Sequence, residues 1–324
     1  MRMLLAATLL AAAAMPAAAE NAADYPSRPI KFISISAAGS GGDVLSRMIT
    51  DKMAPILKST FVIENRPGAS GAIATEMLAK AAPDGYTIGI GGATTHVLLA
   101  ASGAKINYDP VKSFAPIGQI GTASILLVAA NDFPANNARE LVALSKKTPG
   151  GLQYASWGNA STGHFCGALL NLRESAGLNH IPYKAVSQIL TDLQGGHIKL
   201  GMVDMASGSP QVKAGRIKAL AACMSKSPSL PDVRSYEEDG IDFEGQRMGA
   251  LRWALYAPAA TPGPILERLS AALKEAVEMP DVKARLLDLG VTAEFMSGPE
   301  LQATTGRDIG AWKRVGKAAN ISNE

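Results

Sequence analysis

A regular alternation of strand-like and helix-like segments is the feature that most constrains the fold of this chain. Residues 30–36 alternate and are rich in β-branched side chains, and apolar residues then recur at helical spacing across residues 44–56. Further strand-like segments lie at residues 61–64 and 87–91, and Ser70 is placed to cap a helix between them. Strands that alternate with helices pair in parallel through crossover connections. The N-terminal part therefore predicts an α/β domain.

A second alternating series begins near residue 124. Residues 125–129 form a continuous apolar run that suits a buried strand, and Asn137 with Glu140 resembles a capping box. The remaining predicted strands cover residues 153–156, 199–203, 217–222 and 252–257, and the remaining helices cover residues 161–176, 187–194, 262–277 and 299–319. We predict two α/β domains, each a mixed sheet flanked by helices. Domain 2, residues 124–250, is inserted into domain 1, residues 20–123 and 251–324.

The first nineteen residues have the layout of a secretory signal peptide. Arg2 supplies a positive charge, residues 3–15 are apolar but too few to span a bilayer, and residues 17–19 are small. We expect cleavage before Glu20 and export to the periplasm. An oxidising compartment permits a disulfide between Cys166 and Cys223, although two buried thiols would fit the sequence equally well.

Composition and spacing exclude several classes of function. The 324 residues include 31 basic and 28 acidic side chains without a basic patch, so nucleic acid is not an expected partner. The four histidines and two cysteines lack metal-ligand spacing. Residues 158–163 have P-loop spacing, but His164 and Phe165 replace its Lys and Ser/Thr. We therefore expect no metal and no cofactor.

Three glycine- and hydroxyl-rich turns, at residues 37–43, 91–96 and 157–164, each connect a strand to a helix. Free N–H groups at a helix start favour anions, and ligands bind at the strand ends of open α/β sheets. Two such turns facing each other could hold a carboxylate without an arginine. The predicted ligand-binding residues in these turns are Ala38, Gly39, Ser40, Gly41, Asp43, Thr94, His96, Trp157, Asn159, Ala160, Ser161, Thr162 and His164.

Two further residues complete the predicted site. Asp204 follows an apolar strand and either accepts a hydrogen bond from the ligand or a water, or caps a helix that starts near Pro210. Tyr183 could stack on a ligand or pack between the domains. A secreted hydrolase that uses Ser161, His164 and Asp204 is an alternative. The chain has no G-x-S-x-G motif, and the helical spacing of Ser161 and His164 favours capping over catalysis.

Short motifs occur along almost the whole mature chain. They are residues 25–30 (YPSRPI), 64–69 (ENRPGA), 82–87 (APDGYT), 108–116 (YDPVKSFAP), 182–184 (PYK), 193–198 (LQGGHI), 213–220 (KAGRIKAL) and 229–233 (SLPDV). Together they resemble the Bug-type receptors of tripartite tricarboxylate transporters. The resemblance implies a periplasmic-binding-protein fold of the Venus flytrap type, with a ligand between its two domains.

The same resemblance implies a role and a class of ligand. The ligand would be a small mono- or dicarboxylate, possibly aromatic, held by the turns at residues 37–43 and 158–164 with Asp204 at the cleft. The partners would be the membrane components of the transporter, and we expect a monomer. A receptor that signals to a membrane sensor kinase is a second alternative. Ala38 and Ser40 stand where the family usually has proline and glycine, so the ligand is left open.

Overall fold

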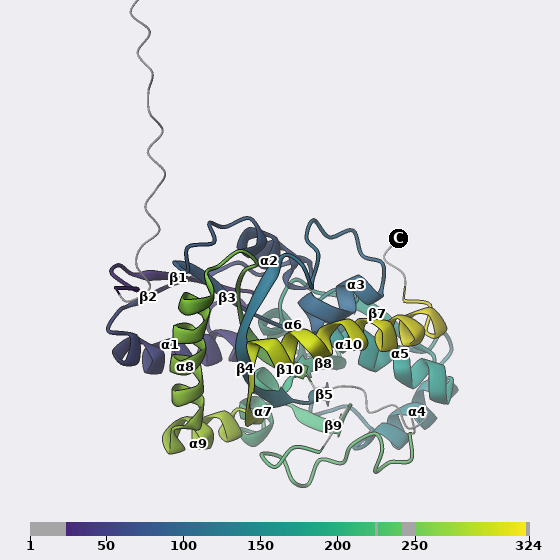
Figure 1. Ribbon diagram of the computed structural model, residues 1–324. Helices are drawn as coiled ribbons and strands as arrows, with labels where there is room; N and C mark the ends of the chain where they lie inside the picture. The colour runs from purple at the N-terminus through teal and green to yellow at the C-terminus, as the bar shows by residue number, and fades with distance from the viewer. Residues whose placement is uncertain (1–23, 224–225, 242–250, 322–324) are drawn as a thin grey trace, which may run out of the picture.

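Two mixed β-sheets, each flanked by helices, make up the computed structural model, which describes residues 24–223, 226–241 and 251–321 (Figure 1). The predicted signal peptide lies outside the described residues, as do residues 249 and 250 of the return crossing that we predict near residues 249–252. Within those residues, no helix has the length and apolar character needed to cross a membrane.

The first sheet has the strand order β11-β4-β10-β3-β1-β2. Strands β1, β2 and β3 are parallel, whereas β4, β10 and β11 pair in antiparallel fashion. These strands are β1 (Ile30–Ser34), β2 (Phe61–Asn65), β3 (Thr87–Gly92), β4 (Phe114–Ala123), β10 (Leu251–Pro258) and β11 (Val291–Ser297). Since β10 enters this sheet after the whole second series, the C-terminal part of the chain completes the first sheet.

The second sheet has the order β7-β6-β8-β5-β9. Its strands are β5 (Ile125–Ala129), β6 (Leu152–Ser156), β7 (Leu178–Pro182), β8 (Leu200–Asp204) and β9 (Lys218–Ala222). The apolar run of β5 is fully buried because β8 and β9 pair with it on both sides and helices cover the sheet. A strand buried on both faces has no solvent side to keep polar.

Helices cover both sheets. They are α1 (Gly41–Leu57), α2 (Ala72–Ala79), α3 (Leu99–Ala101), α4 (Ala138–Lys147), α5 (Thr162–Glu174), α6 (Val186–Gln194), α7 (Met205–Lys213), α8 (Gly263–Glu278), α9 (Pro280–Asp288) and α10 (Gly298–Ala318). A 3-10 turn, η1 (Ala69–Gly71), and a π-helical turn, η2 (Thr94–Leu98), add to these. In Figure 1 the yellow α10 runs from β4 toward α5, where Trp312 meets Phe165 edge to face at 5.3 Å.

Local capping explains several helix starts. The Asn137 side chain accepts a hydrogen bond of 2.8 Å from the backbone N–H of Glu140, which confirms the predicted start of α4. Ser70 was wrongly predicted to cap α2. It has a positive φ of 54°, Gly71 precedes the helix instead, and the Ser70 hydroxyl donates to the Asn159 carbonyl at 2.8 Å. Helix α7 begins at Met205, earlier than the predicted start near Pro210.

Strands β4, β7 and β11 were not predicted. Proline and glycine weaken the strand signal of β4. In the sheet the glycines serve close packing, because a Cβ at Gly121 would lie 2.3 Å from the Thr292 carbonyl oxygen of β11. Pairing with β10 on one side and β11 on the other therefore overrides the weak local propensity.

A disulfide joins Cys166 in α5 to Cys223 at the end of β9, across a sequence separation of 57 residues. Both cysteines are buried. The sequence left the pairing open, and the structure resolves it in favour of the bond. The bond ties the helix that follows the turn at residues 157–161 to the far edge of the second sheet.

We predict that replacing both cysteines by alanine lowers the free energy of unfolding by about 2–4 kcal/mol, because the bond constrains the unfolded chain. Urea unfolding of the mature protein and of C166A/C223A measures this difference. A reductant should destabilise the parent protein and leave the double variant unchanged. Equal unfolding midpoints for the two proteins would contradict a stabilising role of the bond.

Candidate functional site

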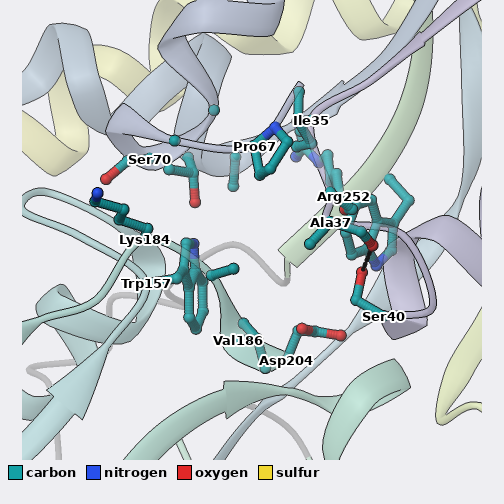
Figure 2. Close-up of a pocket in the computed structure, with 18 residues that line it drawn as sticks. Ile35, Ala37, Ser40, Pro67, Ser70, Trp157, Lys184, Val186, Asp204 and Arg252 are labelled. Carbon is teal, nitrogen blue, oxygen red and sulfur yellow. Dashed lines mark hydrogen bonds between the residues drawn. The ribbon is translucent and has the colours of Figure 1, made fainter. Parts of the chain in front are cut away.

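A cavity of about 70 Å³ lies where the carboxyl ends of parallel strands from both sheets meet (Figure 2). This volume has room for roughly five water molecules, which is the scale of a small organic acid. Its lining residues are Ile35, Ser36, Ala37, Ser40, Pro67, Gly68, Ser70, Gly71, Gly92, Ala93, Thr94, Trp157, Lys184, Ala185, Val186, Asp204, Arg252 and Trp253. The wall is therefore largely apolar, with a few hydroxyl and charged groups.

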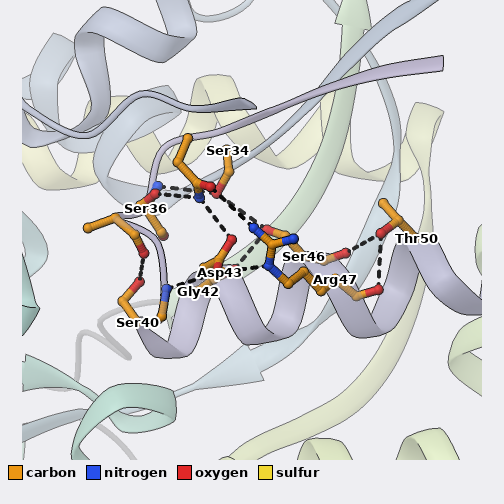
Figure 3. A network of polar contacts seen from close by, with 11 residues as sticks. Ser34, Ser36, Ser40, Gly42, Asp43, Ser46, Arg47 and Thr50 are labelled. Carbon is orange, nitrogen blue, oxygen red and sulfur yellow. Dashed lines mark hydrogen bonds and ion pairs between the residues drawn. The ribbon is translucent and has the colours of Figure 1, made fainter. Parts of the chain in front are cut away.

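The turn after β1 is shaped by the buried carboxylate of Asp43 (Figure 3). Asp43 Oδ2 accepts hydrogen bonds from the backbone N–H of Gly39 at 2.9 Å and from Arg47 Nε at 3.0 Å. Asp43 Oδ1 accepts a bond of 2.8 Å from Asn65 Nδ2, which also donates to the Ser36 carbonyl at 2.9 Å. These bonds hold the turn at the start of α1 and beside the end of β2.

Asp43 therefore supports the site from beneath the turn. Burial acts to raise the pKa of Asp43, but the hydrogen bonds from Arg47, Gly39 and Asn65 outweigh it, so the pKa lies below its ordinary value. The carboxylate is also in the first turn of α1, where negative charge is favourable. The turn is thus organised around a charged group at neutral pH.

The starts of α1 and α7 touch across the two sheets. The backbone N–H of Gly41 donates to the Ser207 hydroxyl at 3.0 Å. A Cβ at Gly41 would lie 2.3 Å from the Ala206 carbonyl carbon and 2.4 Å from the Ser207 nitrogen, so only glycine allows this approach. The Ser207 N–H in turn donates to Asp204 Oδ1 at 2.9 Å, which links the two helix starts to the cavity wall.

Asp204 both caps α7 and lines the cavity. Its residue is 7% exposed, and burial raises its pKa even though the hydroxyl and N–H of Ser207 oppose the shift. The two roles that the sequence left as alternatives therefore coexist at this residue. In Figure 2 Asp204 and Ser40 lie on the same side of the cavity.

A second polar contact joins the turns of the two sheets. The hydroxyls of Thr94 and Thr162 lie 2.8 Å apart, and the Thr162 N–H also donates to Thr94 Oγ1 at 3.3 Å. Thr94 lines the cavity, whereas Thr162 is buried behind it. The start of α5 therefore takes part in the site mainly through contacts with the first sheet.

The predicted site residues fall into two groups. Ser40, Thr94, Trp157 and Asp204 line the cavity. The others form or support the same turns: Ala38 and Gly39 are exposed in the first turn, Gly41 and Asp43 are buried below it, and Asn159, Ala160, Ser161 and Thr162 form the turn into α5. A role of any of them in binding stays a prediction.

His96, a predicted ligand-binding residue, lies outside the lining of this cavity. Its ring is buried in an aromatic cluster, stacked on Tyr256 with ring centroids 3.7 Å apart, and Nδ1 lies 2.9 Å from the Thr95 hydroxyl. Burial lowers the pKa of His96 to about 3, so the imidazole is neutral at pH 7. His96 lines a separate, smaller cavity beside Tyr256.

His164 and Tyr183 are also placed away from the cavity lining. The His164 ring stacks on His180 with centroids 3.9 Å apart, and its Nδ1 accepts from the Ala160 N–H at 3.1 Å. The Tyr183 hydroxyl donates to Asp192 at 2.7 Å. The first of these side chains holds the turn into α5, and the second contacts the last turn of α6.

The hydrolase alternative fails on the same geometry. The Ser161 hydroxyl accepts from the backbone N–H of His164 at 3.1 Å and lies 3.0 Å from the Ser156 hydroxyl. Within the described residues, His164 Nδ1 accepts from the Ala160 N–H and its ring stacks on His180, so its side chain makes no hydrogen bond to Ser161, and Asp204 is bonded to Ser207 instead. A nucleophile needs a base within hydrogen-bonding reach, so Ser161 acts as the cap of α5.

Sequence reasoning missed several lining residues, of which Arg252 matters most. We expected a cleft without an arginine, but Arg252, near the start of β10, lines the cavity. Arg252 lies in the strand that returns to the first sheet, far in sequence from all three turns. The sequence therefore did not indicate that it lines the cavity. Ser36, Ser70 and Lys184 were also missed. Among the described residues, no group of three or more His, Cys, Asp or Glu could hold a metal ion.

Comparison with known proteins places the chain in a family. The profile of the tripartite tricarboxylate transporter family receptor matches residues 45–321. The chain belongs to this family. A UPF0065 protein in the gbd 5' region of Cupriavidus necator is 32% identical over 296 residues, covering 91% of this chain and 88% of that protein. Members of this family are periplasmic binding receptors and not enzymes.

Solved structures agree with this assignment. Rpa4515 from R. palustris, solved with adipate, has a TM-score of 0.87 and 27% identity, covering 92% of this chain and 99% of that one. MatC from Rhodopseudomonas palustris, solved with bound malate, has a TM-score of 0.83 and 29% identity, covering 90% and 99%. This receptor therefore has the two-domain periplasmic-binding-protein fold that the motifs implied.

The Asp43 network predicts a specific dependence of stability on pH. Asp43→Asn should lower the free energy of unfolding at pH 7 by about 1–3 kcal/mol, because it removes charge-assisted hydrogen bonds. The pKa of Asp43 is lowered in the folded state, so its contribution is present above the unfolded value of about 4. The contribution is lost as the pH falls through the folded-state pKa.

Urea unfolding of both proteins between pH 3 and pH 7 measures this effect. The difference between parent and D43N should be constant above about pH 5 and shrink below about pH 4. Asp51→Asn, an exposed position on the same helix, is the matched control and should leave stability within about 0.5 kcal/mol. A difference for D43N that does not change with pH would contradict a charged Asp43.

Proposed function

We propose that this receptor captures a small carboxylate in the cavity between its two sheets and delivers it to the membrane components of a tripartite transporter. The observation that carries the proposal is the cavity itself, which is lined by the hydroxyls of Ser40 and Thr94 from the first sheet and by Trp157 and Asp204 from the second. The family match and the malate and adipate of the two solved relatives support it.

The physical basis of capture is differential stabilisation of a closed state. Hydroxyl and N–H donors from both sheets can bind one anion only when the sheets are close together. The direct contacts of Gly41 with Ser207 and of Thr94 with Thr162 already hold them close. A ligand that bridges the same surfaces adds to these contacts, and its binding requires no covalent chemistry.

The proposal also includes export of the protein, the boundaries of its two domains and its oligomeric state. Residues 1–19 are removed as a signal peptide, domain 1 comprises residues 20–123 and 251–324, and domain 2 comprises residues 124–250. The mature receptor acts as a monomer. Intact-mass analysis of the protein recovered from the periplasm tests the cleavage, since a product that starts at Glu20 is the expected result.

A ligand screen tests the proposed capture. Mature receptor, shown by native mass spectrometry to be ligand-free, is melted with mono-, di- and tricarboxylates, amino acids and aromatic acids. We expect at least one carboxylate to raise the melting temperature, since ligand at 100 times its Kd adds about 2.7 kcal/mol to stability. Shifts with non-acidic solutes alone would overturn the proposal.

A pair of alanine variants tests whether the ligand occupies this cavity. Ala37 lines the cavity, whereas Ala82 is exposed and lies outside its lining. Ala37→Trp should weaken binding of the identified acid roughly tenfold or more by filling the space, as measured by isothermal titration calorimetry. Ala82→Trp should keep the parent affinity. Equal affinities of both variants would place the ligand elsewhere.

A further inference from the structure

Arg252 forms the boundary between two cavities of different size. On one side it lines the cavity of about 70 Å³ that lies between the sheets. On the other side it lines a space of about 20 Å³ that it shares with His96, Asp308 and Trp312, with room for about one water molecule. A solute of several atoms can therefore reach Arg252 only from the side of the larger cavity.

One edge of the Arg252 guanidinium is held by α10. Nη1 lies 2.8 Å from Asp308 Oδ2 and donates to the Thr304 hydroxyl at 2.8 Å. In the part of the chain that the structure describes, Nε and Nη2 have no hydrogen-bond partner. An arginine has five N–H donors in a fixed plane, so the three on Nε and Nη2 are available to one acceptor group. This edge matches the two oxygens of a carboxylate.

Lys184 is the other basic residue of the described lining, but in Figure 2 its amine points away from the cavity. Figure 2 shows Lys184 and Arg252 on opposite sides of the space, with Trp157 and Pro67 between them. Lys184 is exposed and forms no ion pair within the described residues, and Asp204 is the one acidic side chain in the described lining. Arg252 therefore supplies a positive charge at one side of a largely apolar cavity, which suits an anionic group at one end of a solute.

We propose that Arg252 is a specificity-determining residue that binds a second carboxylate of the ligand, so that the receptor selects dicarboxylates over monocarboxylates with the same carbon skeleton. This inference rests on the proposed capture of a carboxylate and narrows it to one class. Asp308 and Thr304 act as positioning residues, because they bind Nη1 from α10 and leave Nε and Nη2 available to the ligand.

The test compares acids that differ by one carboxylate. Mature receptor is titrated calorimetrically with two pairs, adipate with hexanoate and terephthalate with benzoate. For at least one pair the parent protein should bind the diacid about 10- to 100-fold more tightly, which is the effect of one charge-assisted bidentate contact. Arg252→Gln should lower the affinity for the diacid by the same factor and leave the affinity for the monoacid unchanged.

Two further variants keep the result interpretable. Arg28→Gln removes an exposed arginine outside the cavity, paired with Asp84, and should preserve the preference for the diacid. R252Q leaves Asp308 without its cation, so the double variant R252Q/D308N restores charge balance if the single variant does not fold. The double variant should likewise bind both acids of a pair with similar affinity.

The outcomes separate this inference from the proposed function. Equal binding of diacid and monoacid by the parent protein would overturn the role of Arg252 and leave carboxylate capture intact. An equal loss of both affinities in R252Q would also overturn it, because a general loss of affinity does not report on a second carboxylate. Failure of every carboxylate to bind the parent protein would instead refute the proposed function.

Discussion

The contact between the first residues of α1 and α7 is the constraint on which the site depends. Gly41 brings its N–H to the Ser207 hydroxyl at 3.0 Å, and no larger residue fits against the backbone of Ala206. Each of these helices directs the positive end of its dipole toward the cleft. Two positive ends in contact would repel each other without negative charge nearby, so their approach requires compensation.

The chain supplies that compensation with two buried carboxylates. Asp43 lies in the first turn of α1, and Asp204 caps α7. The environments of the two carboxylates shift their pKa values in opposite directions. Asp43 is satisfied by Arg47, Asn65 and Gly39, which lower its pKa, whereas burial raises the pKa of Asp204 at the cavity wall. The first is structural, and the second is positioned to meet a solute.

The first sheet contributes more of the cavity wall than the three turns alone suggested. Antiparallel β10 carries Arg252 and Trp253 to the carboxyl ends of β1 and β3, where the turns lie. Helix α10 then holds Arg252 from behind through Asp308 and also meets α5 of the second sheet through Trp312. The last helix of the chain thus supports the site and contacts the second sheet.

Local patterns in the sequence determined much of this protein. The alternation of strands and helices, the buried run of β5, the cap of α4 and the turns at residues 37–43 and 157–164 all follow from periodicity and capping, which act over a few residues. Strand β4 was not predicted because its glycines and proline weaken the local strand signal, although pairing with its neighbours stabilises it. Only the tertiary structure decided that His96 stacks on Tyr256 and that Arg252 joins the cavity. The reason is that partners such as Asp308, or Ser207 for Gly41, are distant in sequence, and only the packed fold brings them within hydrogen-bonding distance.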